Sequence, residues 1–109
     1  MINTYKIEKT EIVGIAKKLL RGTEDYVLAS RRIVGLIHKM YDNPHDFDEF
    51  KVFIAIDSST DHLPREAVRK HWNKKALTEK DAEYESIYDY YKKPLSEACR
   101  KIIEMWWRQ

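Results

Sequence analysis

The stretch 77-LTEKDAEYESIYDYYKKPLSEACRKIIEM-105 decides the fold class of this chain. Alternating steps of four and three residues pick out one series of side chains, of which a single member is charged: Leu77, Asp81, Tyr84, Tyr88, Tyr91, Leu95, Ala98, Ile102 and Met105. This spacing places them on one stripe of an α-helix. The stretch therefore predicts a long C-terminal helix whose three stripe tyrosines face the core. Pro94 lies inside it and lacks a backbone N–H, so we expect the helix to bend or break there.

The first forty residues also have helical spacing. A first helix is expected to begin at Asn3 or Thr4 and to end at Gly22, since glycine adopts a left-handed conformation at little cost. Thr23 is expected to cap a second helix that stops near Tyr41.

The middle of the chain is expected to add two further helices. Asp46 and Glu49 have the spacing of a capping box that opens the first of them. Within it, residues 52–56 (VFIAI) are apolar on every side, which suits either a buried helix or a short inner strand. We favour a helix, because nothing else in the chain resembles a partner strand. A shorter helix is expected from Pro64 to Trp72, before Asn73 caps the last one.

Length and composition favour a single all-α domain over residues 1–109, a bundle of five to six helices with a long, Pro-bent C-terminal helix. Twenty Lys and Arg residues against 18 Asp and Glu give a net charge of +2, so no global field favours nucleic acid or membrane. Cys99 is the only cysteine and suits a reducing compartment. The start lacks a secretory signal pattern, and no apolar run could span a bilayer. A cytoplasmic protein is expected.

Residues 55–72, AIDSSTDHLPREAVRKHW, gather polar side chains into one turn and the segment after it. We interpret them chiefly as a structural polar clamp between two helices, in which Arg69 forms an ion pair with one of three acids: Asp57, Asp61 or Asp81.

Two chemical alternatives exist for this stretch. Asp57, Asp61 and His62, with His45 or His71, offer metal ligands of suitable type, but the HExxH spacing is absent. Ser58 or Ser59 with His62 and Asp61 would supply the parts of a hydrolase, but there is no Gly-x-Ser-x-Gly elbow. We expect no catalytic residue, no metal and no cofactor.

The layout of charge favours a partner-binding surface. Residues 42–49 hold four acids and no Lys or Arg, and residues 79–91 hold five acids and four tyrosines. Carboxylates steer a cationic partner, and tyrosines bury large area at low entropic cost. The predicted partner-binding residues are Asp46, Asp48, Glu49, Glu83, Asp89 and Tyr90.

Residues 47–81, FDEFKVFIAIDSSTDHLPREAVRKHWNKKALTEKD, resemble a motif of small uncharacterised bacterial helical proteins, of the type AIDSxTDxLPxxxVRxxW. In size, helix content and acid-plus-tyrosine chemistry the chain also resembles bacterial immunity proteins, including those of contact-dependent growth inhibition. That general likeness implies an antitoxin without enzymatic activity. It would bind a cognate toxin, a basic nuclease domain, over or beside the active site of that toxin.

Two other classes of function remain open at this point. The basic segment 65–75 could serve a nucleic-acid-binding or regulatory module, although its acidic flanks would repel phosphate. Trp106 and Trp107 cannot both face one core, so one of them could mediate homo-oligomerisation.

Overall fold

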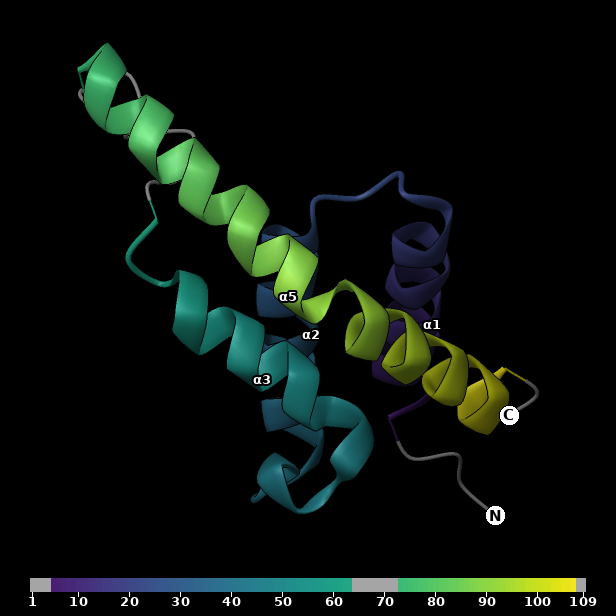
Figure 1. The fold of residues 1–109 in the computed structure, drawn as a ribbon. Coiled ribbons are helices and arrows are strands. Elements are labelled where there is room, and N and C mark those ends of the chain that lie inside the picture. Colours follow the sequence, from purple (N-terminus) through teal and green to yellow (C-terminus); the bar gives the residue numbers. More distant parts are fainter. Residues whose placement is uncertain (1–4, 64–72, 108–109) are drawn as a thin grey trace.

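The computed structural model describes residues 5–63 and 73–107, and all regular structure in these ranges is helical. The elements are α1 (Lys6–Arg21), α2 (Tyr26–Met40), the 3-10 turn η1 (Pro44–Asp46), α3 (Asp48–Thr60) and α5 (Lys74–Trp106) (Figure 1). The all-α prediction is confirmed, and residues 52–56 are helical, within α3.

The described residues hold four α-helices, so the predicted count of five to six is not matched. One reason is that the last helix continues through Pro94 instead of breaking there. The short helix predicted over 64–72 lies outside the described residues.

The four helices form a ring of neighbours. α2 packs against α1 and α3, and α5 packs along both α1 and α3. The polar contacts show that α3 and α5 are antiparallel, since Glu49 near the start of α3 meets Lys101, whereas Ser59 near its end meets Tyr91. The molecule is elongated, with principal extents of 55 × 24 × 24 Å.

The core sits around one half of α5. Its fully buried large side chains include Ile12 of α1, Ile33 and Ile37 of α2, and Phe50 and Phe53 of α3. All buried residues of α5 follow Pro94: Leu95, Ala98, Cys99, Ile102 and Trp106. No side chain between the start of α5 and Pro94 is buried. We call residues 74–93 the arm.

Helix length explains the arm. At 1.5 Å per residue, the 33 residues of α5 extend about 50 Å, whereas helices of 13 to 16 residues extend about 20 to 24 Å. The shorter helices cannot cover α5 along its whole length. Figure 1 shows the first part of α5 extending past the other helices, and its axis changing direction where green turns to yellow. Pro94 accounts for this bend, because it removes one backbone hydrogen bond of the helix.

The stripe predicted along α5 is buried only in its second half. Leu95, Ala98 and Ile102 are in the core, whereas Tyr84 and Tyr91 are half-buried and Tyr88 is 39% exposed. The stripe tyrosines therefore pack at the edge of the core, because the shorter helices end beside them.

Three of the predicted helix ends are confirmed and three are wrong. One of the wrong ones is the start of α1, which begins at Lys6 with Tyr5 in the capping position, and not at Asn3 or Thr4. Gly22 ends α1 with a φ of 72°, α2 gives way to extended backbone at Tyr41, and Asn73 Oδ1 accepts a hydrogen bond from Ala76 N at 2.8 Å. Asp25, not Thr23, caps α2, and its carboxylate accepts from Val27 N and Leu28 N. The capping box of Asp46 and Glu49 does not form, because Pro44 to Asp46 make a 3-10 turn and α3 begins two residues later, at Asp48.

Trp106 and Trp107 have different environments, as the sequence predicted. Trp106 is buried and packs against Phe50, with ring centroids 5.7 Å apart. Trp107 is 57% exposed, and the Lys17 ammonium lies over its ring. An exposed tryptophan is thus left at the end of α5.

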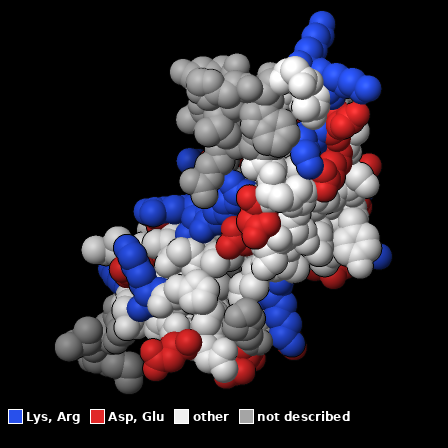
Figure 2. Space-filling view, turned by 90° about the vertical axis from the view of Figure 1, so that its left-hand side faces the viewer, with Lys and Arg blue, Asp and Glu red and all other residues white. Residues whose placement is uncertain are grey.

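The surface carries mixed charge. On the face shown in Figure 2, basic and acidic side chains alternate, and neither sign forms a continuous field. This agrees with the net charge of +2. Among the described helices, none is long and apolar enough to cross a membrane.

The two halves of α5 should differ in their contribution to stability. We expect Ile102→Ala to lower the free energy of unfolding by about 2 to 5 kcal/mol, because it leaves a cavity in the core. Ile87→Ala, the same change in the arm, should cost about 1 kcal/mol or less, because Ile87 is only partly buried. Urea unfolding of both variants measures this difference, and equal losses would show that the arm is packed as tightly as the core.

Candidate functional site

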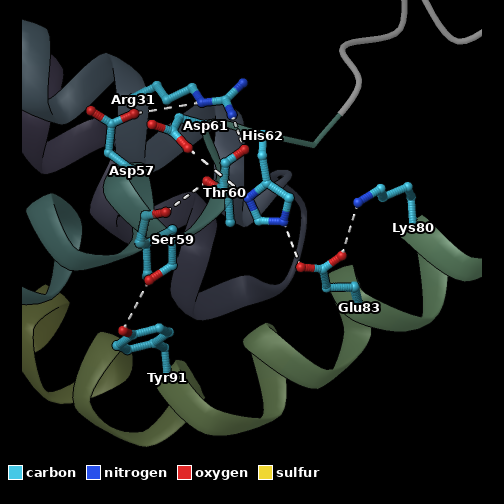
Figure 3. Close-up of polar contacts among 10 residues, drawn as sticks. Arg31, Asp57, Ser59, Thr60, Asp61, His62, Lys80, Glu83 and Tyr91 are labelled. Carbon is cyan, nitrogen blue, oxygen red and sulfur yellow. Dashed lines mark hydrogen bonds and ion pairs between the residues drawn. The ribbon is translucent and has the colours of Figure 1, made fainter.

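The end of α3 is held by an arginine of α2. The Arg31 guanidinium donates a hydrogen bond to the Thr60 carbonyl and lies 3.6 Å from the Asp57 carboxylate (Figure 3). The Arg31 side chain is 17% exposed and that of Asp57 is 36% exposed. Arg31 therefore gives the Thr60 carbonyl a second donor, beside Leu63 N at 3.0 Å, and also neutralises a half-buried acid.

Asp57 thus has a partner that differs from the one predicted. Arg69, the expected partner, lies outside the described residues. Arg31 was missed because it is 26 positions before Asp57 and on another helix. Only the packing of α2 against α3 brings the two together. Of the other residues proposed for the clamp, Asp61 is exposed after α3 and Asp81 is exposed on the arm.

A second polar group ties the turn after α3 to the arm. His62 Nε2 hydrogen-bonds to Glu83, whose other oxygen lies 3.4 Å from Lys80 Nζ, and Asp61 lies 4.0 Å from His62 Nδ1 (Figure 3). The hydrogen bond from His62 lowers the pKa of Glu83, despite the opposing effect of desolvation. Glu83 is therefore already engaged within the chain.

The groups considered for hydrolysis have other partners. Ser59 Oγ lies 3.3 Å from the Tyr91 hydroxyl, and the His62 ring contacts Glu83 and Asp61. Ser58 is exposed. Within the described ranges, no group of three or more His, Cys, Asp or Glu side chains is placed to hold a metal ion. His71 lies outside these ranges, and the described parts of this stretch connect helices.

A large cavity lies between α3 and α5. It has a volume of about 610 Å³ and is lined from both helices by Asp48, Glu49, Lys51, Val52, Ala55, Tyr90, Tyr91, Pro94, Glu97, Ala98 and Lys101. We call it the α3–α5 groove. Three of the six predicted partner-binding residues, Asp48, Glu49 and Tyr90, line it.

Tyr90 is the most exposed aromatic side chain of the groove, at 76%. Its ring stands edge-on to that of Tyr91, with centroids 4.8 Å apart and planes at 83°. Tyr91 is in turn held by Ser59. The exposed ring is therefore supported by a neighbour that is itself fixed to α3.

The charges of the groove are partly paired. Asp48 lies 2.8 Å from Lys51, and the hydrogen bond between them lowers the pKa of Asp48. Glu49 lies 4.0 Å from Lys101. Glu97 is the third carboxylate of the lining, so acids outnumber lysines there by three to two.

The other predicted partner-binding residues lie outside the groove lining. Asp46 is exposed in η1, two residues before Asp48. Asp89 is exposed beside Tyr90 and lies 3.9 Å from Lys92. Glu83 meets His62 just beyond the end of α3, whereas Asp48 begins that helix. The predicted single surface is therefore divided along α3.

Sequence reasoning missed Val52, Ala55, Glu97 and Lys101 as groove residues. Pro94 was the available signal. A proline inside a helix leaves the carbonyl four residues earlier, here that of Tyr90, without a donor from position 94. Pro94 and Tyr90 both line the groove, so the bend of α5 lies in the groove wall.

Comparisons with protein-family models, curated proteins and solved structures find no match to this chain. The resemblances drawn from the sequence therefore stay predictions.

Substitutions can separate the two interactions of Arg31 at the end of α3, the hydrogen bond to the Thr60 carbonyl and the ion pair with Asp57. We expect Arg31→Ala to lower the free energy of unfolding by about 1.5 to 3 kcal/mol, because it removes a charged hydrogen bond to a helix-end carbonyl. Asp57→Ala should cost only about 1 kcal/mol or less, since this pair is partly exposed. Asp61→Ala, which removes an exposed acid four residues after Asp57, is the control and should change little. Denaturant unfolding measures all three. A larger loss for Asp57→Ala than for Arg31→Ala would show that the ion pair, not the cap, dominates.

Proposed function

We propose that this chain is a non-enzymatic protein-binding protein and that the α3–α5 groove, with Tyr90 at its edge, is the centre of its binding surface. The exposed Tyr90 ring beside a cavity of about 610 Å³ carries this proposal. A tyrosine supported on one side and open on the other resembles the aromatic anchors that dominate many interfaces. The cavity beside it has room for side chains of a partner.

The chemistry of the groove favours a cationic partner. Its acids exceed its lysines by one, and Asp46 and Asp89 add exposed carboxylates nearby. Lys and Arg side chains of a partner would pair with these carboxylates.

An immunity protein is the proposed role. The active site of a nuclease is rich in Lys, Arg and His because it holds phosphates. A protein that covers such a site would present carboxylates and aromatic rings, which is what the groove presents. The proposed partner is therefore a basic toxin domain, bound in the cytoplasm without chemistry.

Two further candidates rest on narrower observations. A nucleic-acid-binding module would use residues 65–75, of which only Lys74 and Lys75, exposed at the start of α5, are described among the basic side chains. Homo-oligomerisation would use Trp107, which is 57% exposed. Lys74, Lys75 and Trp107 line neither of the two cavities described between the helices.

The groove can be tested by charge reversal. We expect the double variant Asp48→Lys, Glu97→Lys to weaken partner binding about tenfold or more, because like charges then face a cationic surface. Tyr90→Ala should weaken it by a similar factor through loss of the aromatic anchor. The tagged chain is co-expressed with the protein encoded beside its gene, and the purified pair is titrated by calorimetry.

The double variant Glu79→Lys, Glu85→Lys is the matched control, since it makes the same charge change at two exposed sites of α5 outside the groove. It should leave affinity unchanged, and a loss equal to that of the groove variants would reject the groove. Cell growth tests the immunity role separately from partner binding. If the partner alone arrests cells and co-expression rescues them, the immunity role holds, whereas a harmless partner would remove that role and leave binding intact.

A further inference from the structure

A second cavity lies where the end of α1, the start of α2 and the middle of α5 meet. It has a volume of about 210 Å³, and the lining side chains that matter here are Glu24, Asp25, Tyr26, Tyr84, Tyr88 and Cys99. We call it the tyrosine cavity. It is separate from the α3–α5 groove, with which it shares no lining residue.

The charge of the tyrosine cavity is of one sign. Glu24 and Asp25 are both in its lining, and the lining contains no Lys, Arg or His. The α3–α5 groove, by contrast, includes Lys51 and Lys101. An occupant of the tyrosine cavity would therefore meet negative charge without a competing cation.

Three tyrosine rings form one wall of the cavity. The buried ring of Tyr26 packs against Tyr84 at 4.8 Å and against Tyr88 at 5.0 Å between centroids, with planes at 61° and 52°. Tyr88 is 39% exposed, so solvent reaches its ring. The faces of aromatic rings carry negative potential and attract cations.

Hydrogen bonds fix two of these tyrosines. The Tyr84 hydroxyl donates to the Asp25 carboxylate, and the Tyr26 hydroxyl donates to the Tyr84 carbonyl at 2.7 Å. Burial, aided by the nearby acids, raises the pKa of both phenols, so they stay neutral donors. Donation to a carboxylate makes the Tyr84 ring richer in electrons, which strengthens its attraction for a cation.

The remaining chemistry disfavours a metal ion as occupant. Burial raises the pKa of the Cys99 thiol to about 12, so the thiol stays neutral and is a poor metal ligand. The Asp25 oxygens already accept from Val27, Leu28 and Tyr84. Asp25 therefore contributes charge, while three of its roughly four acceptor positions are already in use. Ring faces and unscreened carboxylate charge suit a weakly hydrated organic cation.

We propose that the tyrosine cavity binds a small organic cation of the methylated-ammonium class. Its volume suits such a group and is below that of most sites for drug-sized ligands, at roughly 300 to 1,000 Å³. The ligand would place its cationic head on the rings of Tyr88 and Tyr84, within the field of Asp25 and Glu24. The site does not depend on the proposed partner or on the α3–α5 groove.

The test uses choline and its neutral isostere, 3,3-dimethylbutanol, as probes of the full chain. Titration is followed by nuclear magnetic resonance of the tyrosine ring protons at constant ionic strength. We expect saturable shifts at Tyr26, Tyr84 and Tyr88 with choline, and an affinity at least about tenfold lower for the neutral isostere. No saturable shift with choline, or equal affinity for both probes, would overturn the proposal.

Two variants at Tyr88 test whether choline binding depends on an aromatic ring or only on a side chain that fills the space. Tyr88→Leu should weaken choline binding about tenfold, whereas Tyr88→Phe, which keeps the ring, should stay within about twofold of the parent. Tyr90→Leu removes an exposed tyrosine outside the cavity and should have no effect. Because Tyr88 lies at the edge of the core, these changes should leave the fold intact, which the dispersion of the same spectra checks. Unchanged affinity in a folded Tyr88→Leu variant would reject the cation–π site.

Discussion

The length of α5 is the constraint on which the rest of the structure depends. Three helices of 13 to 16 residues can cover only part of a helix of 33 residues. The covered part follows Pro94 and contributes Leu95, Ala98, Cys99, Ile102 and Trp106 to the core. The uncovered part is the arm, residues 74–93, which carries the tyrosines and most of the acids that suggested a binding surface. Both cavities open where covered and uncovered parts meet.

Polar contacts and ring contacts attach the base of the arm to the bundle. Ser59 reaches Tyr91, His62 reaches Glu83, and Tyr26 packs between Tyr84 and Tyr88. The exposed His62–Glu83 pair contributes little stability by itself. Together these contacts fix the position of the arm, so that the Tyr90 ring stays at the groove and the Tyr88 ring stays at the tyrosine cavity. The Arg31 cap on Thr60 supports the same arrangement by fixing where α3 ends.

Local patterns in the sequence predicted the fold well. The stripe along residues 77–105, Gly22 as a helix end and Asn73 as a cap all follow from contacts within a few residues. The errors arose where residues close together in the sequence favour different local structures, so that one cap or turn forms in place of the predicted one. Asp25 caps α2 in place of Thr23, and Pro44 starts a 3-10 turn in place of the expected capping box.

The site was less predictable, because it depends on how helices distant in sequence pack. Asp48, Glu49 and Tyr90 were selected for their chemistry, and the antiparallel packing of α3 and α5 brings them to one groove. The same packing separates Glu83 from them and pairs it with His62. The contacts of Arg31 and those of the tyrosine cavity could not be found from spacing, since they join residues 26 to 59 positions apart.

Native-state hydrogen exchange along α5 tests most directly whether one helix serves both as core and as binding surface. Backbone amides of residues 98–106 should exchange only on global unfolding, because their side chains anchor the core. Amides of residues 78–90 should exchange much faster, through local opening of the arm, with Pro94 as the boundary. Uniform protection on both sides of Pro94 would contradict this division, and would mean that the arm is part of the cooperative core.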